Sequence, residues 1–374
     1  MLGRRLGPAA VTAAVALSAS LVPASDAGRA RSTACVPAWK LVLRQPGMGL
    51  SGVAAVSSRD AWAVGHAAGK PLVMHWDGAS WTAVSVPAVE GGLVDVDAVS
   101  ARDVWAVGGY DSPRSRSETL VMHWNGSRWS VLPTPAVHGD GLELVSVSAR
   151  SKRDVWAVGS TDWSTIAPPL TQHWDGRRWT LKPLPRPPSA VDELNGVAAA
   201  SASAAWAVGL WPGHEETQVI YRWNGTRWRR SPAKTNLGVD EEGNAHNWLD
   251  GVDARSPADV WAVGGNLGWP LIEHWNGHGW RIVPSAGTGR LYAVTAVTSR
   301  NAWAVGTWPD RRVEHTRPLI EHWNGRVWRR VRNPRLIGGL YDVDSASTSD
   351  VWAVGSRYEP APADSSAVIE HYGC

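Results

Sequence analysis

Five aspartates at matching positions of repeated segments are the first residues in this sequence that could do chemistry. They are Asp95, Asp97, Asp253, Asp342 and Asp344, and each flanks the valine of a Leu-x-x-Val segment. Clustered carboxylates can hold a cation, or act as acids and bases when burial raises their pKa. The alternative is structural, because aspartates at a crowded axis can bond backbone amides or water. We favour the structural interpretation.

Six histidines recur in register along the chain and suggest metal ligands at first sight. They precede a tryptophan or tyrosine in each case and are His75, His123, His173, His274, His322 and His371. A residue repeated in register around a ring is expected to be a strand constituent whose imidazole satisfies a neighbouring turn. We therefore assign these histidines to the scaffold.

One stretch breaks the repeat more than any other and carries a cluster of acidic and aromatic residues. Ala204 replaces an aspartate and Arg222 replaces the histidine. The two connections of this stretch contain Trp211, His214, Glu215 and Glu216, then Asp240, Glu241, Glu242, His246 and Trp248. A rule broken inside a strict repeat is where function is most plausibly added. Two of these carboxylates could serve as the acid and base of a glycoside hydrolase or lyase.

The same acidic stretch raises the question of calcium. An acidic loop can bind Ca²⁺, but the ligand spacing of an EF-hand, with its terminal bidentate glutamate, is absent. We expect no catalytic residue, no metal and no cofactor, with Ca²⁺ at this loop as the alternative. No Gly-x-Ser-x-Gly, His-Glu-x-x-His or Gly-x-Gly-x-x-Gly pattern occurs, which weakens several enzyme classes.

Aromatic residues stand in one class of connection in six of the seven repeats. They are Tyr110, Trp163, Trp211, Trp269, Trp308 and Tyr358. Flat rings on a rigid surface suit stacking against sugars, or contact with a partner protein. The alternative is that each ring packs over its own loop, and both interpretations stay open.

A repeated hexapeptide supplies the elements that must position these residues. Asp-Val-Trp-Ala-Val-Gly and its near copies occur seven times, with tryptophans at Trp62, Trp105, Trp156, Trp206, Trp261, Trp303 and Trp352. A leucine stands twelve residues before each tryptophan, and His-Trp-Asp/Asn-Gly-x-x-Trp or a variant of it follows. A period of this length indicates one supersecondary unit per repeat.

Each repeat is predicted to form four short strands, the Asn-Gly or Asp-Gly pair making the last hairpin turn. This predicts an all-β fold, a seven-bladed β-propeller of four-stranded antiparallel blades. The last repeat stops before a fourth strand, and residues 39–43 are expected to supply it, closing the ring over residues 366–372. Lengths vary only in the connections after Trp-Ala-Val-Gly and between blades, which share one rim. We take this variable rim as the functional face.

The ends of the chain predict export. Residues 1–30 contain Arg4 and Arg5 before an apolar, alanine-rich run, as in a secretory signal peptide, and residues 31–374 form the propeller. The two cysteines, Cys35 and Cys374, would meet in a closed ring, which favours a disulfide over lipid modification of Cys35. Charges of both signs are interspersed, so neither nucleic acid nor a membrane span is expected.

The repeats resemble secreted bacterial β-propellers of the Asp-box kind and photosystem II assembly-factor-like propellers. The likeness lies in Trp62-Ala63-Val64-Gly65 with Asp77-Gly78 and Trp81, and in their six echoes. These motifs mark a scaffold shared by many functions. We predict a secreted, non-catalytic, monomeric propeller that binds an extracellular glycan or protein through its variable rim, the alternative being the glycosidase or lyase above.

Overall fold

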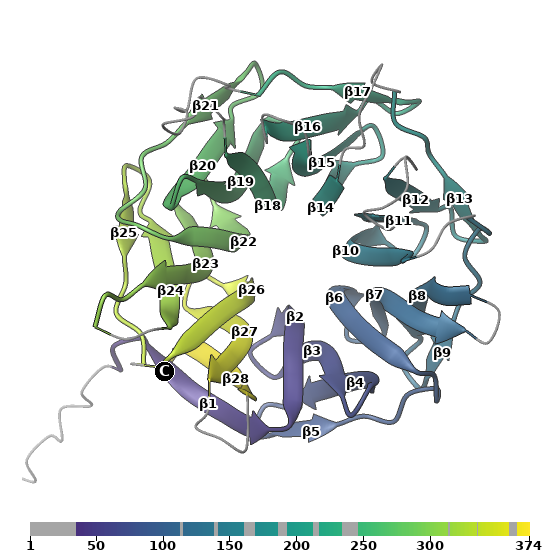
Figure 1. Cartoon of the computed structure of the whole chain (residues 1–374), viewed down its shortest axis with the longest axis horizontal. Helices are drawn as coiled ribbons and strands as arrows, with labels where there is room; N and C mark the ends of the chain where they lie inside the picture. Colours follow the sequence, from purple (N-terminus) through teal and green to yellow (C-terminus); the bar gives the residue numbers. More distant parts are fainter. Residues whose placement is uncertain are drawn as a thin grey trace, which may run out of the picture. The chain divides into compact units, whose positions relative to one another are not determined.

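The short apolar runs of the sequence form strands, and turns connect them, throughout the part of the chain that the structure describes. The computed structural model describes residues 35–112, 115–137, 141–160, 169–185, 193–211, 217–233, 246–312, 315–334, 336–358 and 365–374. The predicted signal segment lies outside these residues. Val36–Cys374 forms one unit in which seven four-stranded antiparallel sheets surround a central channel (Figure 1). The predicted seven-bladed propeller is confirmed.

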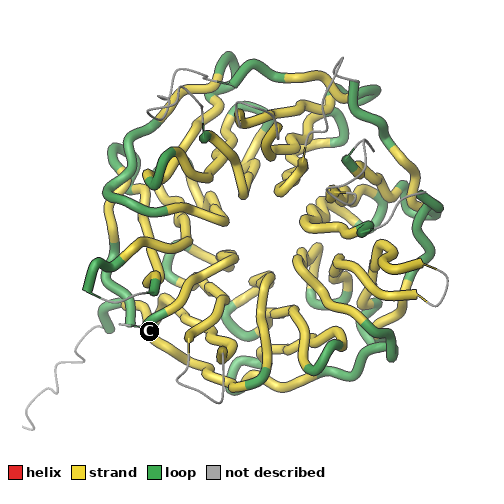
Figure 2. Tube along the Cα trace, in the orientation of Figure 1, coloured by secondary structure: helices red, strands yellow, loops and turns green. Residues whose placement is uncertain are grey.

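The strands occupy the same four positions in every blade (Figure 2). The innermost strands are β2 (Met48–Ser57), β6 (Gly91–Ser100), β10 (Glu143–Ser151), β14 (Glu193–Ser201), β18 (Asn247–Ser256), β22 (Arg290–Thr298) and β26 (Gly338–Ser347). The second strands are β3 (Asp60–Ala67), β7 (Asp103–Ser112), β11 (Asp154–Ser160), β15 (Ala204–Trp211), β19 (Asp259–Asn266), β23 (Asn301–Pro309) and β27 (Asp350–Tyr358).

The two outer positions complete each blade. The third strands are β4 (Lys70–Trp76), β8 (Ser115–Trp124), β12 (Leu170–Trp174), β16 (Thr217–Trp223), β20 (Trp269–Trp275), β24 (Thr316–Trp323) and β28 (Ser365–Gly373). The outermost strands are β5 (Trp81–Ala83), β9 (Trp129–Val131), β13 (Trp179–Leu181), β17 (Trp228–Arg230), β21 (Trp280–Ile282), β25 (Trp328–Arg330) and β1 (Ala38–Pro46).

The Asp-Gly and Asn-Gly pairs make the hairpins between the third and fourth strands, as predicted. In the first blade, Oδ1 of Asp77 accepts hydrogen bonds from the backbone N–H groups of Ala79 (2.8 Å) and Ser80 (2.9 Å). Gly78 has a φ of +94°, in the left-handed region that glycine adopts without a steric penalty. The sequence signature is therefore the local chemistry of a tight turn.

The ring closes through the strand that comes first in the described chain. Strand β1 pairs antiparallel with β28, with Trp39 opposite Tyr372 and Ala38 opposite Gly373 (Figure 1). Neither cysteine is free and both are disulfide-bonded, so Cys35 and Cys374, the only two in the sequence, form the predicted clasp. The N-terminal strand thus completes the last blade and covers the edge of β28 that would otherwise be unpaired.

Tryptophans form the core between neighbouring blades. The ring of Trp62 packs against Trp124 (centroids 5.2 Å apart) and edge-on against Trp129 (5.6 Å) of the next blade. At the closure, Trp352 makes the same contacts with Trp76 and Trp81 of the first blade, both at 5.2 Å. Edge-to-face aromatic pairs combine a large buried area with favourable ring electrostatics. The tryptophans of the repeat signature therefore form the packed interface, or joint, between neighbouring blades.

Candidate functional site

The variable connections lie together on one rim, as the topology requires. In a four-stranded antiparallel blade, the loop after the second strand and the loop leaving the fourth strand emerge on the same side. Backbone hydrogen bonds join the two classes of loop directly, from Gly91 N to Gly69 O (2.8 Å) and from Gly289 N to Gly268 O (2.9 Å). We call this side the variable rim.

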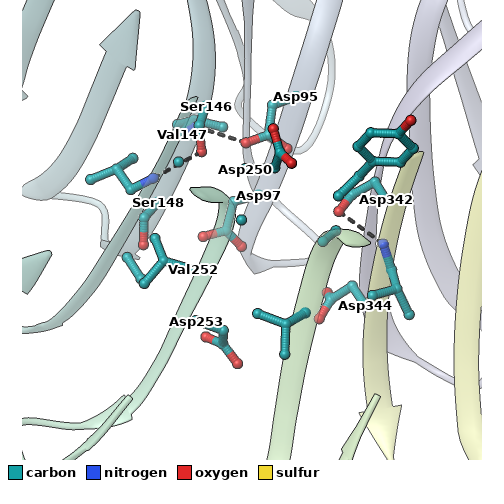
Figure 3. Close-up of a pocket in the computed structure, with 18 of the residues that line it drawn as sticks. Asp95, Asp97, Ser146, Val147, Ser148, Asp250, Val252, Asp253, Asp342 and Asp344 are labelled. Atoms are coloured by element: carbon teal, nitrogen blue, oxygen red, sulfur yellow. Dashed lines mark hydrogen bonds between the residues drawn. The ribbon is translucent and has the colours of Figure 1, made fainter. Parts of the chain in front are cut away.

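The five predicted aspartates line a central channel of about 350 Å³ (Figure 3). They are half-buried, and their side chains reach the innermost strand of the next blade. Oδ2 of Asp342 accepts the N–H of Val53 at 2.7 Å, and Oδ2 of Asp95 accepts that of Val147 at 2.8 Å. The innermost strand is a sheet edge, so these carboxylates satisfy backbone donors that would otherwise lack partners.

All five channel aspartates make such a bond. Asp97, Asp253 and Asp344 accept from Ala149 (2.7 Å), Ala296 (2.6 Å) and Ala55 (2.8 Å), and the Oγ atoms of Ser146 and Ser148 take the same role in the third blade. Burial raises the pKa of Asp95 and Asp344 to about 7 and that of Asp253 to about 6, against backbone bonds that lower them. The structural interpretation is confirmed: these carboxylates fasten one blade to the next.

The repeated histidines are parts of the scaffold, as the sequence indicates. The Nε2 atom of His75 lies 3.0 Å from Oδ1 of Asp60, and its imidazole packs on Trp62 at 4.2 Å between centroids. Four other blades repeat the contact, through His123 with Asp103, His173 with Asp154, His274 with Asp259 and His371 with Asp350. In the sixth blade Asn301 stands in place of the aspartate.

In the fourth blade, both residues of the aspartate–histidine pair are replaced. Where other blades place an aspartate beside a histidine, this blade has Ala204 and Arg222. The guanidinium of Arg222 lies 5.4 Å from the ring centroids of both Trp206 and Trp275, so a cation–π contact replaces the ionic one. In the fourth blade both members of the pair are therefore replaced, whereas the sixth blade keeps its histidine, His322.

Most of the acidic candidates in the fourth blade fall outside the described residues. These are His214, Glu215, Glu216, Asp240, Glu241 and Glu242, together with Trp163 of the third blade. Trp211 is described only as the last residue of β15, and His246 is half-buried just before β18. The calcium and hydrolase hypotheses about these loops stay predictions. Among the described residues, no group of three or more His, Cys, Asp or Glu could hold a metal.

The described rim aromatics divide between loop anchors and exposed rings. The hydroxyl of Tyr110 donates to Oε2 of Glu118 at 2.8 Å, and its ring packs on the core beside Trp129. Trp308 is likewise packed against a core cluster. By contrast, the side chain of Trp269 is 57% exposed, and that of Tyr358 is 45% exposed and stacks on His315 (4.7 Å). Among the rim aromatics whose side chains the structure describes, the exposed rings are therefore those of blades 5 and 7.

A ring of residues that the sequence analysis did not single out surrounds the mouth of the channel. Each follows the leucine that opens the Leu-x-x-Val segment, and they are Ser51, Val94, Val145, Asn195, Asp250, Tyr292 and Tyr341. This position varies freely beside an invariant leucine, and that variability was the available signal. We call these seven residues the mouth ring.

The mouth ring becomes aromatic and charged on blades 5 to 7. The rings of Tyr292 and Tyr341 meet at 60° with centroids 6.0 Å apart, and Tyr341 is 38% exposed. The guanidinium of Arg290 pairs with Asp250 and lies over Trp248 (4.8 Å) and Tyr292 (5.3 Å). Trp248 in turn covers Gly265, where a Cβ would approach the indole Nε1 to 3.0 Å.

The hydroxyls of the two mouth tyrosines are fixed by the second strands behind them. The hydroxyl of Tyr292 lies 3.1 Å from Oγ1 of Thr307, and that of Tyr341 lies 2.6 Å from Oγ of Ser356. Burial raises the pKa of Tyr341. Trp248, Arg290, Tyr292 and Tyr341, which we call the aromatic crescent, are thus held rigidly at the rim, ready to contact a ligand without reorganisation.

Comparison with known proteins supports the fold and leaves the family open. No protein-family model and no curated protein matches the sequence. Among solved structures, the chain resembles one described as YCF48 bound to D1 peptide, with 12% identity, a TM-score of 0.57 and coverage of 90% of this chain and 97% of the other. It resembles the WD40 β-propeller domain of Doa1 (14%, TM-score 0.59, 89% and 97%) and U3-55K (11%, 0.59, 89% and 98%).

These similarities define the class: this chain is a seven-bladed β-propeller, similar in architecture to YCF48 and to WD40 propellers. At such low identity the likeness extends to the fold alone. Among the described residues, no helical segment has the length and apolar character needed to span a bilayer.

Proposed function

We propose that this protein is a non-catalytic binding module that holds a protein or peptide ligand on the variable rim of blades 5 to 7. The observation that carries the proposal is the aromatic crescent at the channel mouth. Tyr, Trp and Arg are the residues that dominate binding energy in protein interfaces, because they offer large, partly polar contact area at low entropic cost. Rigid presentation lowers the cost of binding further.

The propeller class adds support without assigning a ligand. One architectural neighbour is described as bound to a peptide, so a propeller of this shape can accommodate one. Small-molecule or glycan binding is the second candidate, and the exposed ring of Trp269 on the β19–β20 hairpin favours it, since an open indole suits stacking on a sugar. A protein or peptide is the stronger candidate than a glycan, because the aromatic crescent combines several rings with a charged pair.

We further propose that the protein works outside the cytoplasm. Disulfides persist in oxidising compartments and are rare in reducing ones, and the clasp between Cys35 and Cys374 joins the two ends of the ring. The signal-like residues 1–30 agree with this. Fractionation of expressing cells checks it: we expect the protein in the culture medium or periplasm, and a cytoplasmic pool with reduced thiols would contradict it.

The binding proposal is tested by offering the purified, oxidised protein both a randomised peptide library and a saccharide array. We expect peptides to be retained, and Tyr292→Ala and Tyr341→Ala to weaken binding of a selected peptide about thirtyfold each, as for an interface residue worth about 2 kcal/mol. Val94→Ala and Val145→Ala alter the mouth ring on blades 2 and 3 and serve as matched controls. Equal losses in all four variants, or retention of saccharides alone, would refute the proposal.

A further inference from the structure

A second cavity, of about 640 Å³, opens on the variable rim of the sixth blade, away from the channel. It lies between the β23–β24 hairpin and the chain leaving β25. Its lining combines four arginines and a single aspartate with an apolar wall, and the residues are Trp308, Asp310, Arg312, Arg317, Pro318, Arg330, Val331, Arg332, Asn333, Pro334 and Leu336. We call it the arginine pocket.

Two of the four arginines are held in place by the protein. Arg317 is partly buried, and its Nε lies 2.5 Å from Oδ2 of Asp310, so the only carboxylate of the lining is already paired. Arg330 stacks flat on Trp308, with Cζ 3.9 Å from the ring centroid. A guanidinium stacked in this way keeps its N–H edge free to bind an anion while its face is occupied.

The other two arginines add positive charge that the described residues do not balance. Arg312 and Arg332 are exposed, and neither has an ion-pair partner among the residues that the structure describes. Burial lowers the pKa of Arg330, while Glu321 and Asp310 raise it. Glu321 itself is fully buried and already bound by Oγ of Ser285 at 2.7 Å. The pocket therefore presents an excess of guanidinium groups.

The size and the apolar wall of the pocket decide which anion fits. A cavity of about 640 Å³ is far larger than an inorganic ion. Val331 and Pro334, which are half-buried, supply an apolar surface in the same lining as the charges. A ligand that fills both parts carries carboxylates next to apolar groups, and guanidinium groups pair with carboxylates through two parallel hydrogen bonds.

We propose that the arginine pocket binds an acidic peptide segment, with its carboxylates on Arg330 and Arg332 and a neighbouring apolar side chain against Val331 and Pro334. This rests on the proposed function of peptide binding and names the chemistry of the peptide. It also places a contact on the sixth blade in addition to the channel mouth.

The test is a comparison of the peptides that each variant retains from the randomised library. Peptides selected by the unmodified protein should be enriched in Asp and Glu next to apolar residues. The double variant Arg330→Gln/Arg332→Gln should lose that enrichment and bind a selected acidic peptide about a hundredfold more weakly, at roughly tenfold per charge-assisted hydrogen bond. Arg326→Gln, an exposed arginine in the turn on the opposite rim, is the matched control.

The outcomes separate this inference from the proposed function. Retained peptides without acidic enrichment, or enrichment unchanged in the double variant, would overturn the arginine pocket and leave peptide binding standing. No retained peptide at all would overturn both. Both arginines are exposed, so equal thermal unfolding of the variants and the unmodified protein is expected and confirms that the comparison concerns binding.

Discussion

Blades 1 to 3 and blades 5 to 7 share one scaffold, but they differ in the residues of the mouth ring and at one buried position of the third strand. The mouth ring is small or aliphatic on the first three, at Ser51, Val94 and Val145, whereas the last three carry Asp250, Tyr292 and Tyr341. The joints between blades are the same tryptophan contacts in both halves. The contrast teaches that the repeat specifies the propeller, while the aromatic and charged residues of the mouth ring are concentrated on one sector of it.

A buried position on the third strand shows the same division. The residue before the repeated histidine is Met74, Met122 and Gln172 in blades 1 to 3. It is a fully buried glutamate in blades 5 to 7, namely Glu273, Glu321 and Glu370. Buried carboxylates are costly unless they are bonded or protonated. Each of the last three blades therefore contains a buried carboxyl group whose burial costs free energy, and the first three blades do not.

The largest expected effect tests whether the scaffold is the same in both halves. Trp156→Ala in blade 3 and Trp261→Ala in blade 5 each remove a fully buried ring from a joint between blades. Each should lower the free energy of unfolding by about 4 kcal/mol, as for other buried Trp to Ala changes. Urea titration followed by tryptophan fluorescence measures it. A large difference between the two variants would show that the halves are not equivalent.

The next effect concerns the seventh blade, whose outermost strand is joined to the third strand by a disulfide as well as by backbone hydrogen bonds. The double variant Cys35→Ser/Cys374→Ser should lose about 3 kcal/mol, because the crosslink restricts the unfolded chain. Thermal unfolding of the variant and of the unmodified protein, with and without reductant, provides the measurement. The reductant should lower the unfolding midpoint of the unmodified protein and leave that of the variant as it was. If, without reductant, the variant unfolds at the same temperature as the unmodified protein, then β1 alone secures the ring.

The last effect is the contribution of a buried glutamate of blade 7 to the dependence of stability on pH. Burial raises the pKa of Glu370 from 4.5 to about 8, and neither carboxylate oxygen has a hydrogen-bond partner among the described residues. Between these two values the folded state binds more protons than the unfolded state. Stability should therefore be highest near pH 5, fall as the pH rises to 8 and level off above it.

Two substitutions at this third-strand position sharpen the comparison. Glu370→Gln should reduce the fall in melting temperature between pH 5 and 8. The channel aspartates whose pKa is raised, Asp95 and Asp344 among them, should leave part of the fall in place. Gln172→Glu places a carboxylate at the equivalent buried position of blade 3 and should make the fall steeper. Differential scanning calorimetry across the pH series measures both variants. A fall as large in Glu370→Gln as in the unmodified protein would show that Glu370 does not contribute to it.

Most of the fold could be predicted from the sequence, because each motif corresponds to one physical requirement. The Trp-Ala-Val-Gly copies build joints between blades, the Asp-Gly pairs build hairpins, and Trp39 with its strand supplies the missing edge. The closure and the clasp followed because the last repeat lacks a strand that the first residues of the described chain possess. The roles of the channel aspartates and histidines were also inferred correctly, from their regular recurrence.

The candidate site could be predicted only in part. That functional groups sit on the variable rim was an inference from loop lengths, and the exposed Trp269 and Tyr358 agree with it. Of the aromatic crescent and the arginine pocket, only Trp248 and Trp308 were singled out from the sequence. The other members were missed, because they come from different blades or strands and carry no known motif. Tyr292 and Tyr341 lie about fifty residues apart and meet only when blades 6 and 7 pack side by side.

The clasp has a mechanical consequence for anything attached to the ring. Because Cys35 and Cys374 are covalently joined, a pull between the residues before Cys35 and the carboxyl group of Cys374 loads the sulfur–sulfur bond before the hydrogen bonds between β1 and β28. Stretching would leave the blades between them without tension. A ligand held on the rim would thus sit on a platform shielded from force, and that shielding would vanish in a reducing solution.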